Sequence, residues 1–172
     1  IANLADPSSR RTLLAEAEQS VASGQIDWTG FFPLPDSPVS HVFGPRDSVA
    51  AIASRRGVTV AEAFIDLACE MDGRRGFSWP ILNQNMDEVL GMLNRDYVTL
   101  GLADAGAHAT QIMDASQPTF LLTHWVRDRG AFTLEEAVRR LTSDTADLFG
   151  VAGRGRLEPG AFADVNVIDM DG

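Results

Sequence analysis

The sequence has very little cysteine, with Cys69 as the single example among 172 residues. A disulfide within the chain needs two cysteines and a structural zinc site needs a cluster of thiolates, so the sequence excludes both. One cysteine is typical of a protein that works in a reducing compartment, and we predict a cytoplasmic location. The sequence also lacks the run of about 18 apolar residues that a membrane-spanning helix requires, so we expect no membrane partner.

Positive charge is scarce as well. The chain has 14 Lys and Arg against 24 Asp and Glu, which gives a formal net charge of −10. Such a field repels a phosphate backbone, so nucleic acid is not an expected partner. Hydrophobic residues make up 45% and charged residues 22% of the chain, which is globular composition, and the length lies at the upper end of one domain.

Several motifs that carry complete catalytic sites are missing. The sequence contains no His-x-His, no His-Glu-x-x-His, no glycine-rich phosphate loop and no Gly-x-Ser-x-Gly elbow. It begins at Ile1 without a charged and apolar leader, and it stops at Gly172 just after an expected strand. We therefore expect a piece of a longer protein that holds part of a site at most.

Helix signals are frequent along the chain. They consist of capping residues, glycines past a helix end and apolar residues at helical spacing. Thr133 and Glu136 form a complete capping box, and Asn85 with Glu88 resembles one. The spacing predicts helices that begin or end near these positions: 6–24, 48–57, 59–71, 85–93, 118–130, 133–142 and 144–150.

Strand signals are fewer. Residues 97–103 are nearly continuous in apolar character, as expected for a parallel strand covered on both faces. Residues 77–82 form a second candidate, which Pro80 weakens or moves to an edge. With the helix between them they predict a βαβ unit, hence an α/β fold. A further strand is expected over 164–169, and residues 25–45 are expected to be irregular chain with at most a short strand.

Asp104 is the most informative candidate for chemistry, because it directly follows the expected strand at 97–103. The carboxyl ends of parallel strands are where α/β proteins bind ligands and place catalysis. The alternative is that Asp104 caps the following turn. Gly106 would allow the backbone to approach a ligand or to make an ordinary turn. His108 could carry a proton, donate to a substrate, bind a metal, or be a plain loop residue.

The remaining reactive side chains have simpler interpretations. His124 lies in an expected helix, where packing explains it better than ligation. His41 has no partner in its proline-rich segment, and Cys69 is interpreted as a small buried hydrophobe. The row of Glu62, Asp66 and Glu70 is interpreted as a solvated helix face rather than a cation site.

Three stretches together resemble the C-terminal part of amidohydrolase-superfamily enzymes, and most closely the N-acyl-D-amino-acid deacylase (D-aminoacylase) group. They are 100–108, which contains Asp-Ala-Gly-Ala-His, the helix pair at 134–150, and the Gly-x-Leu-x-Pro-Gly-x-x-Ala-Asp stretch that leads into 169. The resemblance implies a metal-dependent (β/α)8 TIM-like barrel with a small β-sandwich built from both chain ends. It assigns 1–152 to the barrel and 153–172 to the start of the sandwich.

The resemblance also implies roles for individual residues. Asp104 matches the aspartate at the end of the eighth barrel strand, which binds or faces the metal, taken to be zinc, and acts as general acid and base on an amide. His108 and Gly106 would contact the substrate. The family's other metal ligands are absent from this sequence, and residues 113–118 replace the His-Pro-Arg stretch that D-aminoacylases tend to carry.

The expected activity is therefore hydrolysis of a small-molecule amide by a longer parent enzyme, with this chain inactive alone. One alternative is a cyclic-amide hydrolase of the hydantoinase type, and another is a noncatalytic assembly domain. Part of a barrel exposes unpaired strand edges and apolar faces, so we expect a homo-oligomer or pairing with the missing N-terminal part.

Overall fold

The computed structural model describes residues 6–24, 27–36, 42–101 and 114–170. The chain forms two compact units, Ile1–Gln84 and Asn85–Gly172, and each is described by itself. The boundary expected at 152/153 from the resemblance concerns a longer protein and stays a prediction.

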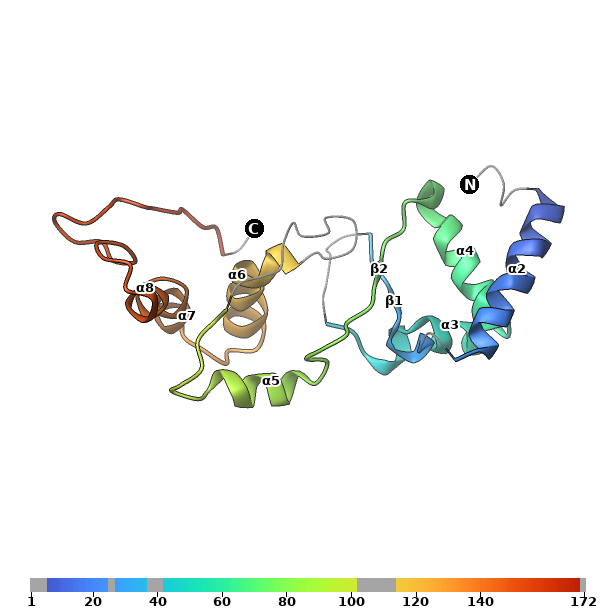
Figure 1. Cartoon of the computed structure of the whole chain (residues 1–172), viewed down its shortest axis with the longest axis horizontal. Helices are drawn as coiled ribbons and strands as arrows, with labels where there is room; N and C mark the ends of the chain where they lie inside the picture. The colour runs from blue at the N-terminus through green and yellow to red at the C-terminus, as the bar shows by residue number, and fades with distance from the viewer. Residues whose placement is uncertain (1–5, 25–26, 37–41, 102–113, 171–172) are drawn as a thin grey trace. The chain divides into compact units, whose positions relative to one another are not determined.

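Three α-helices form the first unit: α2 (Pro7–Ala22), α3 (Val49–Arg56) and α4 (Val60–Gly73). Each begins where the sequence predicts, because a side-chain oxygen caps its free amides. Asp6 accepts from the Ser9 amide at 2.8 Å, and Ser48 and Thr59 cap α3 and α4 in the same way. Helix α4 packs against both α2 and α3 (Figure 1).

The first unit also contains two short strands. Strands β1 (Phe32–Pro33) and β2 (Phe77–Ser78) pair antiparallel, with Phe32 opposite Ser78. The strand predicted over 77–82 is therefore confirmed for two residues only, and Ile81 and Leu82 beyond Pro80 are 73% and 78% exposed. Of two 3₁₀ turns, η1 (Trp28–Gly30) lies in the segment expected to be irregular, and η2 (Pro45–Asp47) begins at the last residue of that segment.

The core of the first unit combines small helix residues with aromatic rings. Val49, Ala53, Ala63 and Leu67 are buried where α3 and α4 meet. Four rings cover this contact with centroids 4.8 to 5.7 Å apart: Trp28, Phe31, Phe64 and Phe77. We call these four residues the aromatic cluster; it ties the irregular segment and β2 to the helices.

The second unit is helical in its described residues. Its elements are α5 (Met86–Leu93), η3 (Asp114–Ser116), α6 (Gln117–Phe120), the π-helix η4 (Leu121–Asp128), α7 (Leu134–Leu141) and α8 (Ser143–Phe149). The predicted caps are confirmed. Thr133 and Glu136 make both capping-box bonds, at 3.1 and 2.9 Å, and Gly130 and Gly150 end their helices at positive φ.

The core of this unit surrounds η4. Leu121, Leu122 and Trp125 are buried together with Phe132 and Ala137. The apolar stripe predicted for 85–93 packs against this cluster through Met86, Val89, Leu90 and Leu93, as does Leu100. The helix pair α7 and α8 completes the described part of the unit.

The other strand predictions are wrong where the structure tests them. Residues 97–101 form a turn and extended chain rather than a strand, with Tyr97 86% exposed; residues 102 and 103 lie outside the described ranges. Residues 164–169 form no strand, and Val167 is 98% exposed. A strand needs a neighbour to satisfy its backbone groups. Within the described residues, only β1 and β2 have one, so the predicted βαβ unit is not formed there.

Candidate functional site

The residues singled out for catalysis, Asp104, Gly106 and His108, lie in the stretch 102–113, outside the residues that the structure describes. The same holds for His41. Their assigned roles therefore stay predictions, and the structure informs the site through the elements on either side.

Both flanks of this stretch are fixed by one core. On the N-terminal side, Leu100 packs against the cluster around Trp125, and on the C-terminal side Phe120 packs against the same cluster. Pro118 stands in the first turn of α6, as the sequence predicts, because its missing N–H costs nothing there. The described residues on either side of 102–113 thus pack on the core of the second unit.

His124 lies on η4 close to this core. Its ring stacks on Phe120 with centroids 4.8 Å apart, and it meets the Trp125 ring edge-on at 4.7 Å. Burial lowers the pKa of His124 below its usual value, and Arg129 lowers it further, against a smaller opposing effect of Asp128. Its buried Nε2 has no hydrogen-bond partner in the structure. These contacts are those of the helix-packing residue that the sequence predicts.

A metal site is not visible in the described part of the chain. Within those residues, no group of three or more His, Cys, Asp or Glu side chains is arranged to hold an ion. Cys69 is half-buried on α4 with a free thiol, rather than fully buried as expected. None of the helices in the described ranges is long and apolar enough to cross a membrane.

The acidic row on α4 keeps solvent-exposed carboxylates, with Asp66 and Glu70 39% and 37% exposed, but these two also make ion pairs. Asp66 pairs with Arg10 of α2, and Glu70 pairs with Arg56 of α3 at 3.3 Å. Glu70 also forms an ion pair with Arg75, with Nη2 2.8 Å from the carboxylate oxygen. The spacing was identified correctly, but the partners come from distant parts of the sequence, so periodicity alone could not reveal them. Asp66 and Glu70 thus link α4 to α2 and α3 by partly exposed ion pairs.

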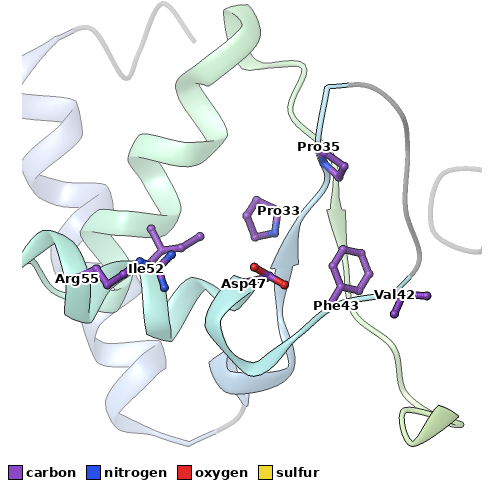
Figure 2. Close-up of a pocket in the computed structure, with 7 residues that line it drawn as sticks. All are labelled: Pro33, Pro35, Val42, Phe43, Asp47, Ile52 and Arg55. Carbon is purple, nitrogen blue, oxygen red and sulfur yellow. The ribbon is translucent and has the colours of Figure 1, made fainter. Parts of the chain in front are cut away.

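A pocket of about 270 Å³ lies in the first unit between β1, η2 and α3 (Figure 2). Its lining is largely apolar and carries two charged side chains: Pro33, Pro35, Val42, Phe43, Asp47, Ile52 and Arg55. The Asp47 carboxylate accepts from the Gly44 amide at 2.7 Å, and the Arg55 guanidinium donates to the Arg46 carbonyl at 2.5 Å. Both charges thus bond to the local backbone, and the described residues of the lining include no acid–base pair for amide hydrolysis. The sequence analysis missed this pocket, whose signal is the density of proline and phenylalanine in 31–45.

Comparison with known proteins places most of the chain in one family. A model described as "Amidohydrolase family" matches residues 39–172, a range that includes Asp104, Gly106 and His108. A protein of Mycobacterium tuberculosis described as uncharacterized is 31% identical over 178 residues, which cover 96% of this chain and 28% of that protein. The chain thus spans little more than a quarter of the length of this relative.

Shorter matches connect the chain to named enzymes. A D-aminoacylase of Alcaligenes xylosoxydans xylosoxydans is 53% identical over 49 residues, 28% of this chain and 10% of that enzyme. An N-acyl-D-glutamate deacylase of the same organism is 49% identical over 53 residues, 31% of this chain and 11% of that enzyme. No solved structure matches the chain.

Proposed function

The chain belongs to the amidohydrolase family, and from this membership we propose that it is the C-terminal part of a hydrolase that deacylates N-acyl-D-amino acids. The family supports hydrolysis of an amide-type bond. The observation that carries the narrower proposal is the pair of local matches near 50% identity, both to proteins named for removing an acyl group from a D-amino acid or its derivative.

The family implies a TIM-barrel-like fold. We assign residues 1–152 to the last part of such a barrel and 153–172 to the start of a small β-sandwich. Val165 and Ile168 are 60% and 54% exposed. Apolar side chains in an extended segment without a neighbouring strand are what a strand presents when the sheet that it joins lies elsewhere in a longer protein.

Amidohydrolases are generally metal-dependent. The described residues do not supply a set of ligands that fits an ion. We propose that this chain supplies one ligand or facing carboxylate, Asp104, and that the remaining ligands come from outside the chain, because the sequence has no His-x-His pair. Zinc is the proposed metal; when bound, it would acidify the attacking water toward a pKa of about 7.

Asp104 is proposed to move the proton. Its carboxylate would accept a proton from the water that attacks the amide carbon and return it to the amine nitrogen as the C–N bond breaks. The water oxygen then stays with the acyl group as a carboxylate, and the amine leaves as the free D-amino acid. Gly106 and His108 are proposed to contact the substrate, where the glycine permits close backbone approach.

The test uses the full-length protein that contains this chain, loaded with zinc. We expect it to hydrolyse N-acetyl-D-amino acids, to lose that activity with a chelator and to regain it with the metal. N-acetyl-L-amino acids serve as the matched control for chirality. Faster turnover of hydantoin or a dihydropyrimidine would instead assign a cyclic-amide hydrolase. No hydrolysis of any of these by the metal-loaded protein would favour the noncatalytic assembly domain.

The partners follow from the same proposal. We expect a small-molecule amide and no nucleic acid, and we expect the isolated chain to self-associate or to pair with the rest of the longer protein. Sedimentation of the isolated chain tests this, and a monomer at every concentration would contradict it.

A further inference from the structure

Helix α4 ends in a left-handed turn. Met71 has φ 55° and ψ 37°, Asp72 has φ 56° and ψ 35°, and Gly73 follows at φ 72°. The preceding residue, Glu70, is extended, with ψ 158°. Glycine adopts this region readily, but a residue with a Cβ prefers the right-handed region. Two such residues in succession therefore need an external reason to stay left-handed.

Within the turn, Nε of Arg74 donates to the Met71 carbonyl at 3.2 Å, and a pair of arginines contacts the residue before the turn. The two carboxylate oxygens of Glu70 face Nη2 of Arg56 at 3.3 Å and Nη2 of Arg75 at 2.8 Å. Arg56 belongs to the end of α3, whereas Arg75 follows the turn itself. Glu70 is thereby fixed from both sides, and the chain between Glu70 and Arg75 must reverse within four residues.

Arg75 is fixed in turn by the chain on the other side of the sheet. Its Nη1 donates to the Leu34 carbonyl at 2.6 Å, and its Nη2 lies 3.2 Å from the Asp36 carboxylate. Its side chain is 14% exposed, so these contacts are shielded from water far more than those of an ordinary surface pair. We call Arg56, Glu70 and Arg75 with these two partners the Arg75 clamp.

The turn determines where β2 lies. Directly after Arg75, the Gly76 carbonyl accepts from the Leu34 amide at 2.9 Å, and Phe77 pairs with Pro33. Phe77 also stacks on Phe31 of the aromatic cluster, with centroids 5.4 Å apart. A change of handedness at 71–73 would redirect the chain and so remove both the strand pairing and the Phe77 ring from the cluster.

We propose that residues 70–75 form a conformational switch, in which the Arg75 clamp holds Met71 and Asp72 left-handed and thereby keeps β2 on β1. Without the clamp, these two residues return to the right-handed region and β2 leaves β1. The switch is independent of the proposed hydrolase activity, because it rests only on contacts within the first unit.

Amide hydrogen exchange of Leu34 in the full 172-residue chain tests the switch, since this amide reports β1–β2 pairing directly. We expect Arg75→Gln to raise its exchange rate about tenfold or more, and Arg11→Gln on the exposed face of α2, with the same loss of charge, to leave it unchanged. Equal exchange in the two variants would overturn the proposal.

A matched pair at Asp72 separates a switch from a simple staple. Asp72→Gly and Asp72→Ala both remove the exposed carboxylate, but only glycine accepts the left-handed region without penalty. In the Arg75→Gln background we expect Leu34 to exchange about fivefold more slowly with glycine than with alanine, because the left-handed region costs a residue with a Cβ about 1 kcal/mol. If both variants exchange at the same rate, in this background and with Arg75 present, handedness does not control β2 and the proposal fails.

Discussion

Different contacts stabilise the interior of each unit. In the first, an aromatic cluster gathers the irregular segment onto the helices. Ion pairs between elements distant in sequence occur in both units, as Arg10 with Asp66 in the first and Arg129 with Asp87 in the second. In the second, one cluster around Trp125 gathers α5, η4 and α7, while the segment after α8 leaves large apolar side chains exposed, such as Leu157 at 80% and Val167 at 98%.

This difference separates what a stretch of chain can complete by itself from what it cannot. Helices satisfy their own backbone and need only one buried face, so both units form theirs. Strands need partners, and the apolar segment at 164–169 has none among the described residues. The second unit is thus well packed around its helices and open at its end.

The largest effect is expected from Trp125→Ala, which should destabilise the second unit and leave the first unchanged. Trp125 is 2% exposed at the centre of its cluster. Trp125→Ala should cost about 3–5 kcal/mol of unfolding free energy, because it leaves a cavity. Amide exchange should then show loss of protection in the second unit, while the Val49 amide, bonded to the Phe31 carbonyl at 2.8 Å, keeps its protection.

Val167→Ala is the control, since a side chain 98% exposed should change stability by no more than about 0.5 kcal/mol. Simultaneous loss of protection in both units after Trp125→Ala would contradict the division into two units.

A smaller loss of stability is expected from a substitution in the segment after α8. Gly155 has φ +79°, and a Cβ there would lie 2.9 Å from the carbonyl carbon and oxygen of Thr142. Gly155→Ala should destabilise the second unit by about 2–4 kcal/mol, from a left-handed penalty of about 1–2 kcal/mol plus the overlap. Gly160→Ala is the matched control, because φ is +90° there but a Cβ would meet nothing within 4 Å.

Denaturant unfolding of the two variants measures the difference. Equal destabilisation by the two substitutions would show that the 151–162 segment does not dock closely on the α7–α8 junction.

The smallest effect concerns pH. The folded-state pKa of His124 is lowered, first by burial and then by Arg129, so the unfolded state binds its proton more readily. Neutral His124 therefore contributes fully to the unfolding free energy of the second unit at pH above about 6.5, the pKa of histidine in the unfolded chain. The unfolding free energy should decrease as pH falls below that value. His124→Phe, which retains the ring, should flatten this dependence in urea titrations between pH 5 and 8 (about the range in which histidine titrates). An unchanged slope in the variant would assign the dependence to other groups.

Local signals predicted the helices well. Five helices begin at the capping residue that the sequence predicts for them: Asp6, Ser48, Thr59, Asn85 and Thr133. A cap is decided within three residues, so the sequence carries it completely. The end of α4 was less predictable, because Met71 and Asp72 lie in the left-handed region although neither is glycine.

The strands and the site could be predicted less well from the sequence, because they depend on contacts with distant residues. The apolar runs at 97–103 and 164–169 have strand composition, but strand pairing depends on a partner segment that the composition of the run itself does not reveal. Asp104 was identified from its position after an expected strand and from the resemblance, and the match of the family model to 39–172 supports that resemblance. The role of Asp104 remains the central prediction.

The most direct measurement is the turnover of an N-acyl-D-amino acid by the zinc-loaded full-length protein and its Asp104→Asn variant, with metal content determined in both. If Asp104 moves the proton, kcat should fall by a factor of about 100 or more while the variant stays folded. An Asp104→Asn variant that retains wild-type kcat would contradict the assignment of this residue.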